Sequence, residues 1–433
     1  MQTLEQLRNG ELKGATALKL CEGLTEFPVE IYELADTLEK LELSGNNLSA
    51  LPADFSKLRK LRILFCSDNP FTRLPEVLGD CPLLDTVGFK SCLIEDVPTK
   101  AINPNLRWLI LTNNRIKELP ANLSMCTRIE KLALAGNQLT EIPDLSNCKE
   151  LGLLRISANR LANLPQWLLS MPKLSWLGYS GNPFCIHAEV PQLQAIAWDT
   201  LEVGAVLGQG ASGIIYKGTM PYNDSRKDVA IKVYKGAVTS DGLPEDEMNA
   251  SILAGEHDGL VKNIGQLTGH PENMMGLVME LIPETYYNLG MPPSLQSCTR
   301  DVFAANMQLG AAQAANIATT VASAAAHLHS KGILNGDLYA HNTLTDDKGN
   351  ALISDFGAAA FYDKNDVVTA KALERIEVRA LGCMLDDLIP HITTSNNDFV
   401  TTTFKQLRDA CWQPDILSRP NFETLYNSLS ALV

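Results

Sequence analysis

The first half of the chain repeats one pattern of apolar residues every 22 or 23 residues. Each full copy has spaced leucines, a polar turn and a closing apolar segment, as in LEKLELSGNNLSALP (38–52) and LRWLILTNNRIKELP (106–120). LKLCEGLTEFP (18–28) is a degenerate opening copy. One position of the pattern, the ladder position, carries asparagine in every full copy except one, which has Cys92. The asparagines are Asn46, Asn69, Asn114, Asn137, Asn159 and Asn182. A period of this length is the mark of a repeat architecture.

Such copies must stack because one copy alone cannot form a core. A single copy supplies one short strand with leucines on one side, and it cannot bury that side alone. Stacked copies make a continuous core, in which the ladder amides can satisfy loop backbone groups that would otherwise be buried without partners. The pattern resembles the leucine-rich-repeat family. That resemblance implies an α/β solenoid whose strands line a concave side and bind partners rather than catalyse reactions.

Strand positions that point away from the leucine core form a candidate partner surface. In the register that the pattern favours, charged residues such as Lys40, Glu42 and Lys131 are interspersed with apolar ones. The apolar members are Ile63, Phe65, Trp108, Ile110, Leu153 and Trp176. An apolar stripe rimmed by charges is typical of an interaction surface. A register shifted by one residue would instead bury these side chains.

The net charge of −14 and the absence of any lysine or arginine run argue against a nucleic-acid partner. The N-terminus lacks the basic and apolar segments of a signal peptide. Polar residues interrupt the alanine-rich stretch 302–328, which predicts a buried amphipathic helix rather than a membrane span. The ten cysteines form no CxxC pair, so we expect reduced thiols and a cytoplasmic location rather than disulfides.

The repeat pattern ends after Phe184, and residues 187–199 are expected to be a short connector. The segment LGQGASGIIYKG (207–218) then has glycine spacing that also matches dinucleotide-binding loops. It continues, however, as a β-branched strand and not as a helix. Four further segments follow in order: VAIKVY (229–234), LVMELI (277–282), GILNGDLYAHNTL (332–344) and ALISDFGAA (351–359).

This ordered set resembles the eukaryotic-type protein kinase superfamily. The segment CWQPDILSRPNFETL (411–425) resembles its tyrosine-kinase-like branch. The resemblance implies three parts: a leucine-rich-repeat domain (1–186), the connector (187–199) and a bilobal α+β kinase domain (200–433). It also implies ATP and Mg²⁺ as ligands.

The site residues implied by the resemblance fall into four groups. They are Gly208, Gly210 and Gly213 beside the ATP phosphates; Lys232 on the α- and β-phosphates and Asp337 at the substrate hydroxyl; Asn342 and Asp355 on Mg²⁺; and Glu280 and Ile282, after the gatekeeper Met279, with backbone groups for adenine. Glu247 is the first candidate for the carboxylate partner of Lys232, and Glu245 is the second. In the C-terminal motif, Arg419 is expected to pair with Glu374.

The catalytic loop departs from the family pattern at several positions. Asn335 and Gly336 stand where the family has His and Arg, and Tyr339 replaces the lysine common in serine/threonine kinases. The activation segment is short, with only Tyr362 and Thr369 as phosphorylatable residues. Glu377 stands where the next helix usually begins with aspartate.

The predicted function is a Mg-ATP-dependent protein kinase that acts on serine or threonine. Its repeats would bind a protein substrate or regulator. Two alternatives stay open at this point. One is a non-enzymatic pseudokinase scaffold, which the changes at Asn335 and Tyr339 allow. The other is a small-molecule kinase of the same superfamily, which the short activation segment favours.

Overall fold

A computed structural model describes residues 2–186, 188–210, 212–236, 238–393 and 398–433. The chain divides into two compact units. The first unit comprises residues up to Met171 together with Asn182–Phe184. The second unit comprises Pro172–Gly181 and the residues from Cys185 onward. The short segment Pro172–Gly181 therefore belongs with the second unit, although its sequence follows the repeat pattern.

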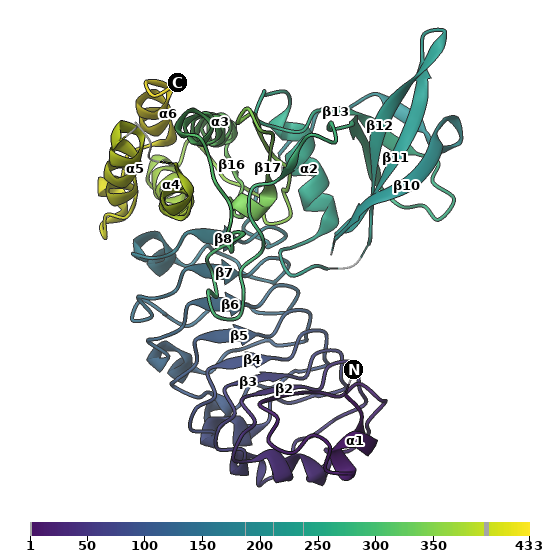
Figure 1. Cartoon of the computed structure of the whole chain (residues 1–433), viewed down its shortest axis with the longest axis vertical. Coiled ribbons are helices and arrows are strands. Elements are labelled where there is room, and N and C mark those ends of the chain that lie inside the picture. Colours follow the sequence, from purple (N-terminus) through teal and green to yellow (C-terminus); the bar gives the residue numbers. More distant parts are fainter. Residues whose placement is uncertain (1, 187, 211, 237, 394–397) are drawn as a thin grey trace. The chain divides into compact units, whose positions relative to one another are not determined.

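Seven short parallel strands build the first unit, and Figure 1 shows them stacked like rungs. Each strand pairs with the next through all three of its residues. The strands are β1 (Ala17–Lys19), β2 (Lys40–Glu42), β3 (Ile63–Phe65), β4 (Thr86–Gly88), β5 (Trp108–Ile110), β6 (Lys131–Ala133) and β7 (Leu153–Arg155). The helix α1 (Leu4–Arg8) precedes them, and Thr3 caps it with its side chain.

The ladder amides bond as the sequence predicts. Asn137 donates from Nδ2 to the carbonyls of Leu111 and Leu134, both at 2.9 Å, and accepts from the Ile116 amide at 3.1 Å. Asn46, Asn69, Asn114, Asn159 and Asn182 make equivalent bonds to buried backbone groups. At the exceptional position, the Cys92 thiol contacts the Cys66 carbonyl at 3.4 Å. Each amide thus links adjacent copies and satisfies backbone groups that the turn would leave unpaired.

Short 3₁₀ helices form the other side of the repeats. They are η1 (Val29–Leu34), η2 (Phe55–Lys57), η3 (Glu76–Asp80), η4 (Thr99–Ala101), η5 (Ala121–Met125) and η6 (Gln166–Ser170). A proline stands at the N-cap of five of these six, with φ between −60° and −69°. The fixed φ of proline sets the turn from the strand side into each helix.

The strand register is confirmed, but fewer of the predicted apolar strand residues reach the surface than expected. Leu64 and Leu109 are buried, while their strand neighbours Ile63, Phe65, Trp108 and Ile110 are half-buried. The prediction that Leu153 is exposed on the partner surface was wrong, because all three residues of β7 are buried and Leu153 is only 5% exposed. The prediction for Trp176 was also wrong: this side chain is 2% exposed and packs inside the second unit.

One sheet of six strands forms the first part of the second unit, in the order β10-β11-β12-β14-β13-β9. Its core contains Met220, Val229, Ile231, Leu267 and Val278. The strands are β9 (Ala195–Ala197), β10 (Glu202–Gln209), β11 (Gly213–Tyr222), β12 (Ser225–Tyr234), β13 (Asn263–Thr268) and β14 (Gly276–Glu280). The helix α2 (Pro244–Ala254) follows β12, and η7 (Trp198–Thr200) follows β9.

The predicted connector is partly a strand. Ala195–Ala197 pairs in parallel with Gln266–Thr268, and Ile196 is buried in the core of the sheet. Residue His187 of the connector lies outside the described residues. The stretch has no periodic pattern because it contributes only three residues to a sheet whose other strands come from elsewhere in the chain.

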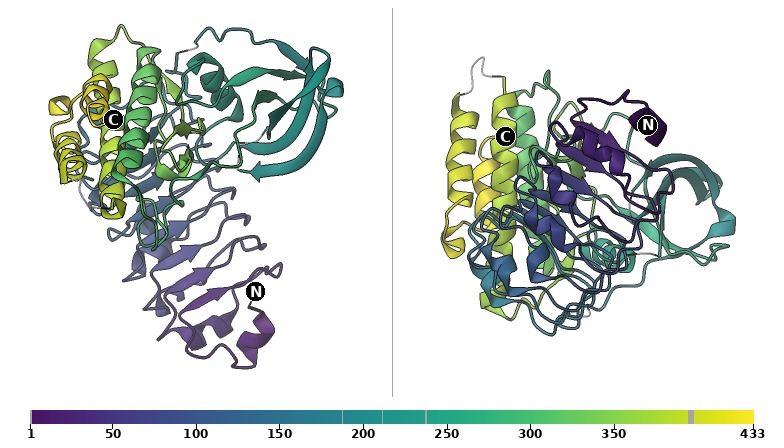
Figure 2. Two further views of the ribbon diagram at one scale, coloured as in Figure 1. Left: turned by 45° about the horizontal axis from the view of Figure 1, so that its top comes forward. Right: turned by 90° about the horizontal axis from the view of Figure 1, so that it is seen from below.

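Helices dominate the rest of the second unit, where Figure 2 shows them side by side. They are α3 (Ala311–Ser330), α4 (Val367–Leu388), α5 (Asp398–Cys411) and α6 (Phe422–Ser430), with η8 (Ala340–Asn342), η9 (Ile389–His391) and η10 (Ile416–Ser418). The short strands are β8 (Trp176–Gly178), β15 (Tyr287–Asn288), β16 (Ile333–Leu334), β17 (Thr343–Thr345), β18 (Ala351–Ile353) and β19 (Ala360–Phe361).

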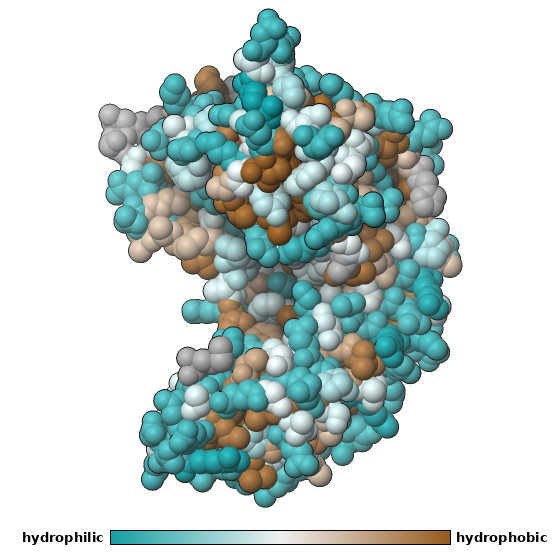
Figure 3. All heavy atoms as spheres, turned by 90° about the vertical axis from the view of Figure 1, so that its right-hand side faces the viewer, coloured by the Kyte–Doolittle hydropathy of each residue, from teal (hydrophilic) through white to brown (hydrophobic). Residues whose placement is uncertain are grey.

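The alanine-rich helix α3 is buried as predicted, although it begins at Ala311 and not near Val302. It packs against α6, α4 and β18. None of the helices in the described ranges combines the length and the hydropathy that a bilayer span requires. All ten cysteines are free thiols, and eight of them are buried. On the side of the molecule drawn in Figure 3, hydrophilic side chains surround scattered hydrophobic ones, as is usual for a protein surface.

Candidate active site

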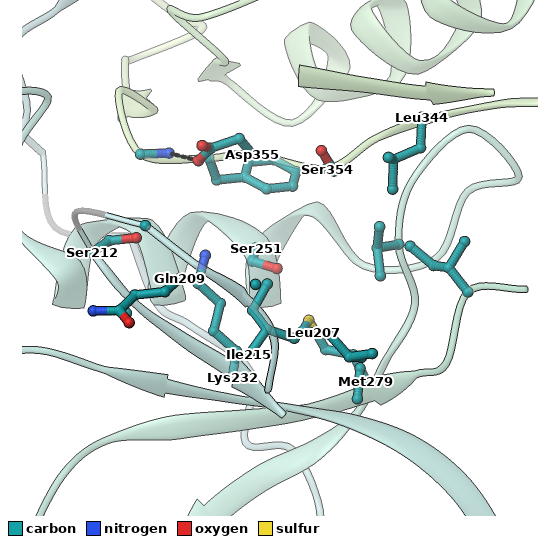
Figure 4. Close-up of a pocket in the computed structure, with 18 of the residues that line it drawn as sticks. Leu207, Gln209, Ser212, Ile215, Lys232, Ser251, Met279, Leu344, Ser354 and Asp355 are labelled. Carbon is teal, nitrogen blue, oxygen red and sulfur yellow. Dashed lines mark hydrogen bonds between the residues drawn. The ribbon is translucent and has the colours of Figure 1, made fainter. Parts of the chain in front are cut away.

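A cavity of about 750 Å³ lies in the second unit between its sheet and the segment that follows β18. The strands β10, β11 and β12 supply one wall, and Ser354, Asp355 and Phe356 supply another. Figure 4 shows Lys232 and Asp355 on opposite sides of this space, with Met279 and Leu344 at its other end. A concave site with apolar walls and a few convergent charges is where a small ligand is expected to bind.

Lys232 forms an ion pair with Glu247 at the wall of the cavity. Lys232 lies on β12, which pairs with β11 and β14 on its two sides, so its backbone is held in the middle of the sheet. Glu247 lies in the first turn of α2, and its side chain is 3% exposed. Burial raises the pKa of the Glu247 carboxyl, and the neighbouring Lys232 charge opposes that rise. Of the two predicted candidates, the structure therefore pairs Lys232 with the first.

The three predicted glycines differ in what they permit. A Cβ at Gly208 or Gly210 would meet nothing within 4 Å. A Cβ at Gly213 would lie 2.5 Å from the carbonyl oxygen of Val233, because β11 passes close to β12 at that point. Gly208 and Gly210 thus leave open space for a ligand beside the backbone, while Gly213 is required by strand packing.

The predicted adenine-binding backbone lies at the end of β14. Met279 and Glu280 pair with Ala230 and Val229 of β12, and both line the cavity together with Ile282. The amide of Glu280 donates to the carbonyl of Lys262 at 2.9 Å. Within the described residues, the Ile282 amide donates no hydrogen bond to the protein, which leaves it for a ligand.

The catalytic loop is joined to Asp355 by amide side chains. Asn342 donates from Nδ2 to Asp337 Oδ2 at 2.8 Å. Asn335 accepts from the Asp337 amide at 3.1 Å and donates to the Asp355 carbonyl at 2.9 Å. Asp337 and Asn342 do not line the cavity themselves, but Asn335 connects them to its wall. Asn335 stands where the family has histidine. Its side chain is fully buried, and both its amide oxygen and its amide nitrogen form hydrogen bonds.

Glu377 of α4 accepts hydrogen bonds from the backbone of the same loop. Its carboxylate accepts from the amides of Asn335 at 3.3 Å and Gly336 at 2.6 Å, and it contacts His329 Nε2 at 2.8 Å. The glutamate thus stands in for the aspartate of the family pattern. Gly336 has a φ of +73°, a conformation that favours glycine.

The expected pairing of Arg419 with Glu374 was wrong. Arg419 donates instead to the carbonyls of Gln413, Arg375 and Pro172, at 2.9, 3.0 and 2.7 Å. Glu374 pairs with Arg375 and accepts from the Phe422 amide. α4 runs without a break from Val367 to Leu388, so Glu374 is part of a helix rather than the end of a loop.

Two acidic residues of the site, Asp301 and Asp241, were not predicted from the sequence. His341 pairs with Asp301 at 2.7 Å, and its amide donates to the same carboxylate at 3.0 Å. Burial opposes charge on the imidazole, but the bond to Asp301 raises the pKa of His341 above its ordinary value. Asp241 lines the cavity close to Gly357. Asp301 and Asp241 lie in loops without a motif, so no local pattern marks them.

The comparisons with known proteins agree with this geometry. Residues 201–391 match the family described as protein tyrosine and serine/threonine kinase. Residues 104–147 and 37–58 match models of leucine-rich repeats. The chain therefore carries leucine-rich repeats and a protein kinase domain.

Several of the similar proteins are named as kinases. A probable serine/threonine-protein kinase of Dictyostelium discoideum is 25% identical over 276 residues, which cover 55% of this chain and 28% of the relative. The epidermal growth factor receptor of Drosophila melanogaster is 29% identical over 221 residues, or 50% of this chain and 14% of the receptor. CBL-interacting protein kinase 22 of Oryza sativa is 29% identical over 171 residues, or 37% of each chain. The match thus spans little more than a third of each of these relatives at most.

The different surroundings of the glycines give a first prediction. Gly213→Ala should lower the midpoint of thermal unfolding of the second unit, because its Cβ would collide with the backbone of Val233. Overpacking of this kind costs about 1–3 kcal/mol. Gly208→Ala is the matched control, since open space surrounds it, and it should leave the midpoint unchanged. Calorimetry of both full-length variants checks this, and equal midpoints would contradict the packing role of Gly213.

Proposed function

We propose that the chain is a Mg-ATP-dependent protein kinase that transfers the γ-phosphate of ATP to a serine or threonine hydroxyl of a protein. The observation that carries the proposal is the Lys232–Glu247 ion pair on one wall of a cavity whose opposite wall bears Asp355. The Dictyostelium relative named as a probable serine/threonine-protein kinase supports the choice of acceptor. A cytoplasmic location stays a prediction.

Phosphoryl transfer needs charge neutralisation and positioning more than covalent help. Lys232 is 12% exposed at its side chain, so its charge acts on bound phosphates with little screening by water. Glu247 fixes the position of that charge. Asp337 is oriented by Asn342 and by the Asn335 contact to its amide, which suits it to accept the proton of an acceptor hydroxyl.

The donor groups near the cavity fit a magnesium ion. Among the described residues, no cluster of three or more His, Cys, Asp or Glu side chains could hold a metal. Mg²⁺ does not need one, because it takes one or two protein carboxylates together with phosphates and water. Asn342 donates from Nδ2 to Asp337 and so keeps its amide oxygen as a ligand, and Asp355 supplies a carboxylate. A bound Mg²⁺ would neutralise charge on the transferred phosphate.

The repeats supply a surface for a protein partner. The half-buried residues Phe65 and Trp108 lie edge to face, with ring centroids 6.3 Å apart, and the Lys131 ammonium lies 4.4 Å from the Trp108 ring. Ile63 and Ile110 extend the same stripe. Aromatic residues beside a cation are typical anchors of protein interfaces. We infer that this patch binds a protein substrate or regulator.

Loss of the catalytic carboxylates should abolish transfer. Asp337→Asn and Asp355→Asn should each lower the rate by at least ~10²-fold, since each removes a group that acts in the transition state. The measurement is transfer of radiolabel from ATP to a generic protein substrate by the full-length chain. Asp347→Asn changes an exposed aspartate of the same unit and serves as the control. Near-normal rates in both variants would mean that the site is misassigned.

Activity should not require phosphorylation of the segment after Asp355. Gly336 offers no side chain to bind a phosphate, and Tyr362 is 7% exposed with its hydroxyl bonded to the His329 carbonyl at 3.1 Å. Phosphatase-treated protein and Thr369→Ala should therefore keep most of the wild-type rate. Mass spectrometry confirms the phosphorylation state of each sample. A tenfold drop in rate after dephosphorylation would overturn this expectation.

The repeat patch should control which proteins are labelled. Trp108→Asp should change either the set of extract proteins labelled from radioactive ATP or, if the repeats restrain the kinase, the basal rate on a generic substrate. Met125→Asp places the same charge at an exposed position on η5 and is the control. Identical labelling and identical basal rates for Trp108→Asp and wild type would show that the patch binds neither a substrate nor a regulator.

A further inference from the structure

β8 has the sequence of a repeat strand but lies in the second unit, against the catalytic loop. Its Trp176 ring is parallel to the Tyr339 ring, with centroids 4.4 Å apart and an interplanar angle of 4°. The indole N–H of Trp176 donates to the carbonyl of Leu338 at 3.2 Å. Leu338 is the residue directly after Asp337. Trp176 and Tyr339 are 2% and 4% exposed, so the contact is shielded from water.

The same strand also passes close to Gly336, the residue before Asp337. A Cβ at Gly336 would lie 2.5 Å from the carbonyl oxygen of Leu177 and 2.8 Å from that of Ala358. Real Cβ atoms do not approach backbone so closely. The arginine that the family places here would therefore not fit between β8 and the segment after Asp355. The Gly336 departure, which the sequence left without a reason, is explained by the close approach of β8.

Further bonds fix this strand to the rest of the second unit. The Tyr179 hydroxyl donates to the carbonyl of Phe361 at 3.3 Å. Arg379 of α4 donates to the Ser175 hydroxyl at 2.9 Å. Arg419 donates to the Pro172 carbonyl at 2.7 Å, and β8 packs directly on α4. The segment Pro172–Tyr179 is thus bonded to α4, to β19 and to the C-terminal motif, in addition to the loop.

We propose that Trp176 is a positioning residue for catalysis, and that the repeat-derived strand β8 is a built-in brace of the catalytic loop. The proposal rests on the proposed kinase function. The residue before Asp337 donates its amide to Glu377, and the residue after it accepts from Trp176 of β8, so both neighbours of Asp337 are hydrogen-bonded. In kinases with an arginine at this position, a phosphorylated segment can order the loop by binding that arginine. Here β8 is always present and orders the loop instead. Small displacements of a catalytic group cost up to ~10²-fold in rate.

The test uses the full-length chain with Trp176→Leu and Trp176→Phe. The leucine variant keeps an apolar side chain but loses the ring and the N–H donor, while phenylalanine restores the ring. We expect Trp176→Leu to lower kcat by at least ~10-fold with the KM for ATP within about twofold of wild type. Amide exchange should accelerate across residues 333–345 and stay unchanged across 229–234. Trp176→Phe should recover most of the rate. Trp167→Leu, in η6, is the matched control.

The outcomes separate this proposal from the kinase assignment. If wild type transfers no phosphate, the proposed function fails first. If wild type is active and Trp176→Leu keeps its kcat and its loop exchange, the brace is wrong. Should Trp176→Leu not fold, Tyr339→Leu removes the same stack from the other side and is read in the same way. Wild-type exchange at residues 336–339 as fast as at the exposed turn 222–225 would also overturn the brace.

Discussion

The buried carboxylate of Glu377 is the contact on which the geometry of the catalytic loop depends. It is 1% exposed, and a carboxylate so far from water is tolerated only when hydrogen bonds replace its solvation. Two consecutive loop amides and the His329 ring meet that need. The His329 ring is itself bonded to the Tyr362 hydroxyl at 2.8 Å. The loop, α3 and the segment after Asp355 are thereby tied to one acidic group.

The rest of the site follows from this anchor. With the backbone fixed at residues 335 and 336, Asn335 can reach both the Asp337 amide and the Asp355 carbonyl. The shortened segment after Asp355 continues directly into α4, so the helix that bears Glu377 also includes the residues that would form a regulatory loop. β8 occupies space against Gly336 that an arginine side chain would need. The glycine at position 336, the short segment after Asp355 and the position of β8 are therefore linked, because each makes room for the others around the loop.

Local patterns predicted those parts of the structure that repeat or carry a motif. The ladder amides and the strand register were visible from spacing and residue type, and the Lys232–Glu247 pair followed from the resemblance to protein kinases. The contacts of Glu377 with the loop were not predicted, because the sequence marked this residue only as a departure from the aspartate of the family. The burial of Trp176 and Leu153 was not, because a repeat pattern fixes which way a side chain points but not what covers it. Arg419 was misassigned for a related reason: the carbonyl of Pro172 that it binds lies 247 residues away in the sequence.

We propose that the loop, held by Glu377, supports phosphoryl transfer from Mg-ATP without being phosphorylated. The most direct measurement compares single-turnover transfer by dephosphorylated wild type and Glu377→Gln. A glutamine would present N–H donors to loop amides that are themselves donors, so one amide must lose its partner. We expect transfer by wild type and a rate at least ~10-fold lower in Glu377→Gln, with unchanged ATP affinity. Equal rates in the two proteins, or no transfer by either, would contradict it.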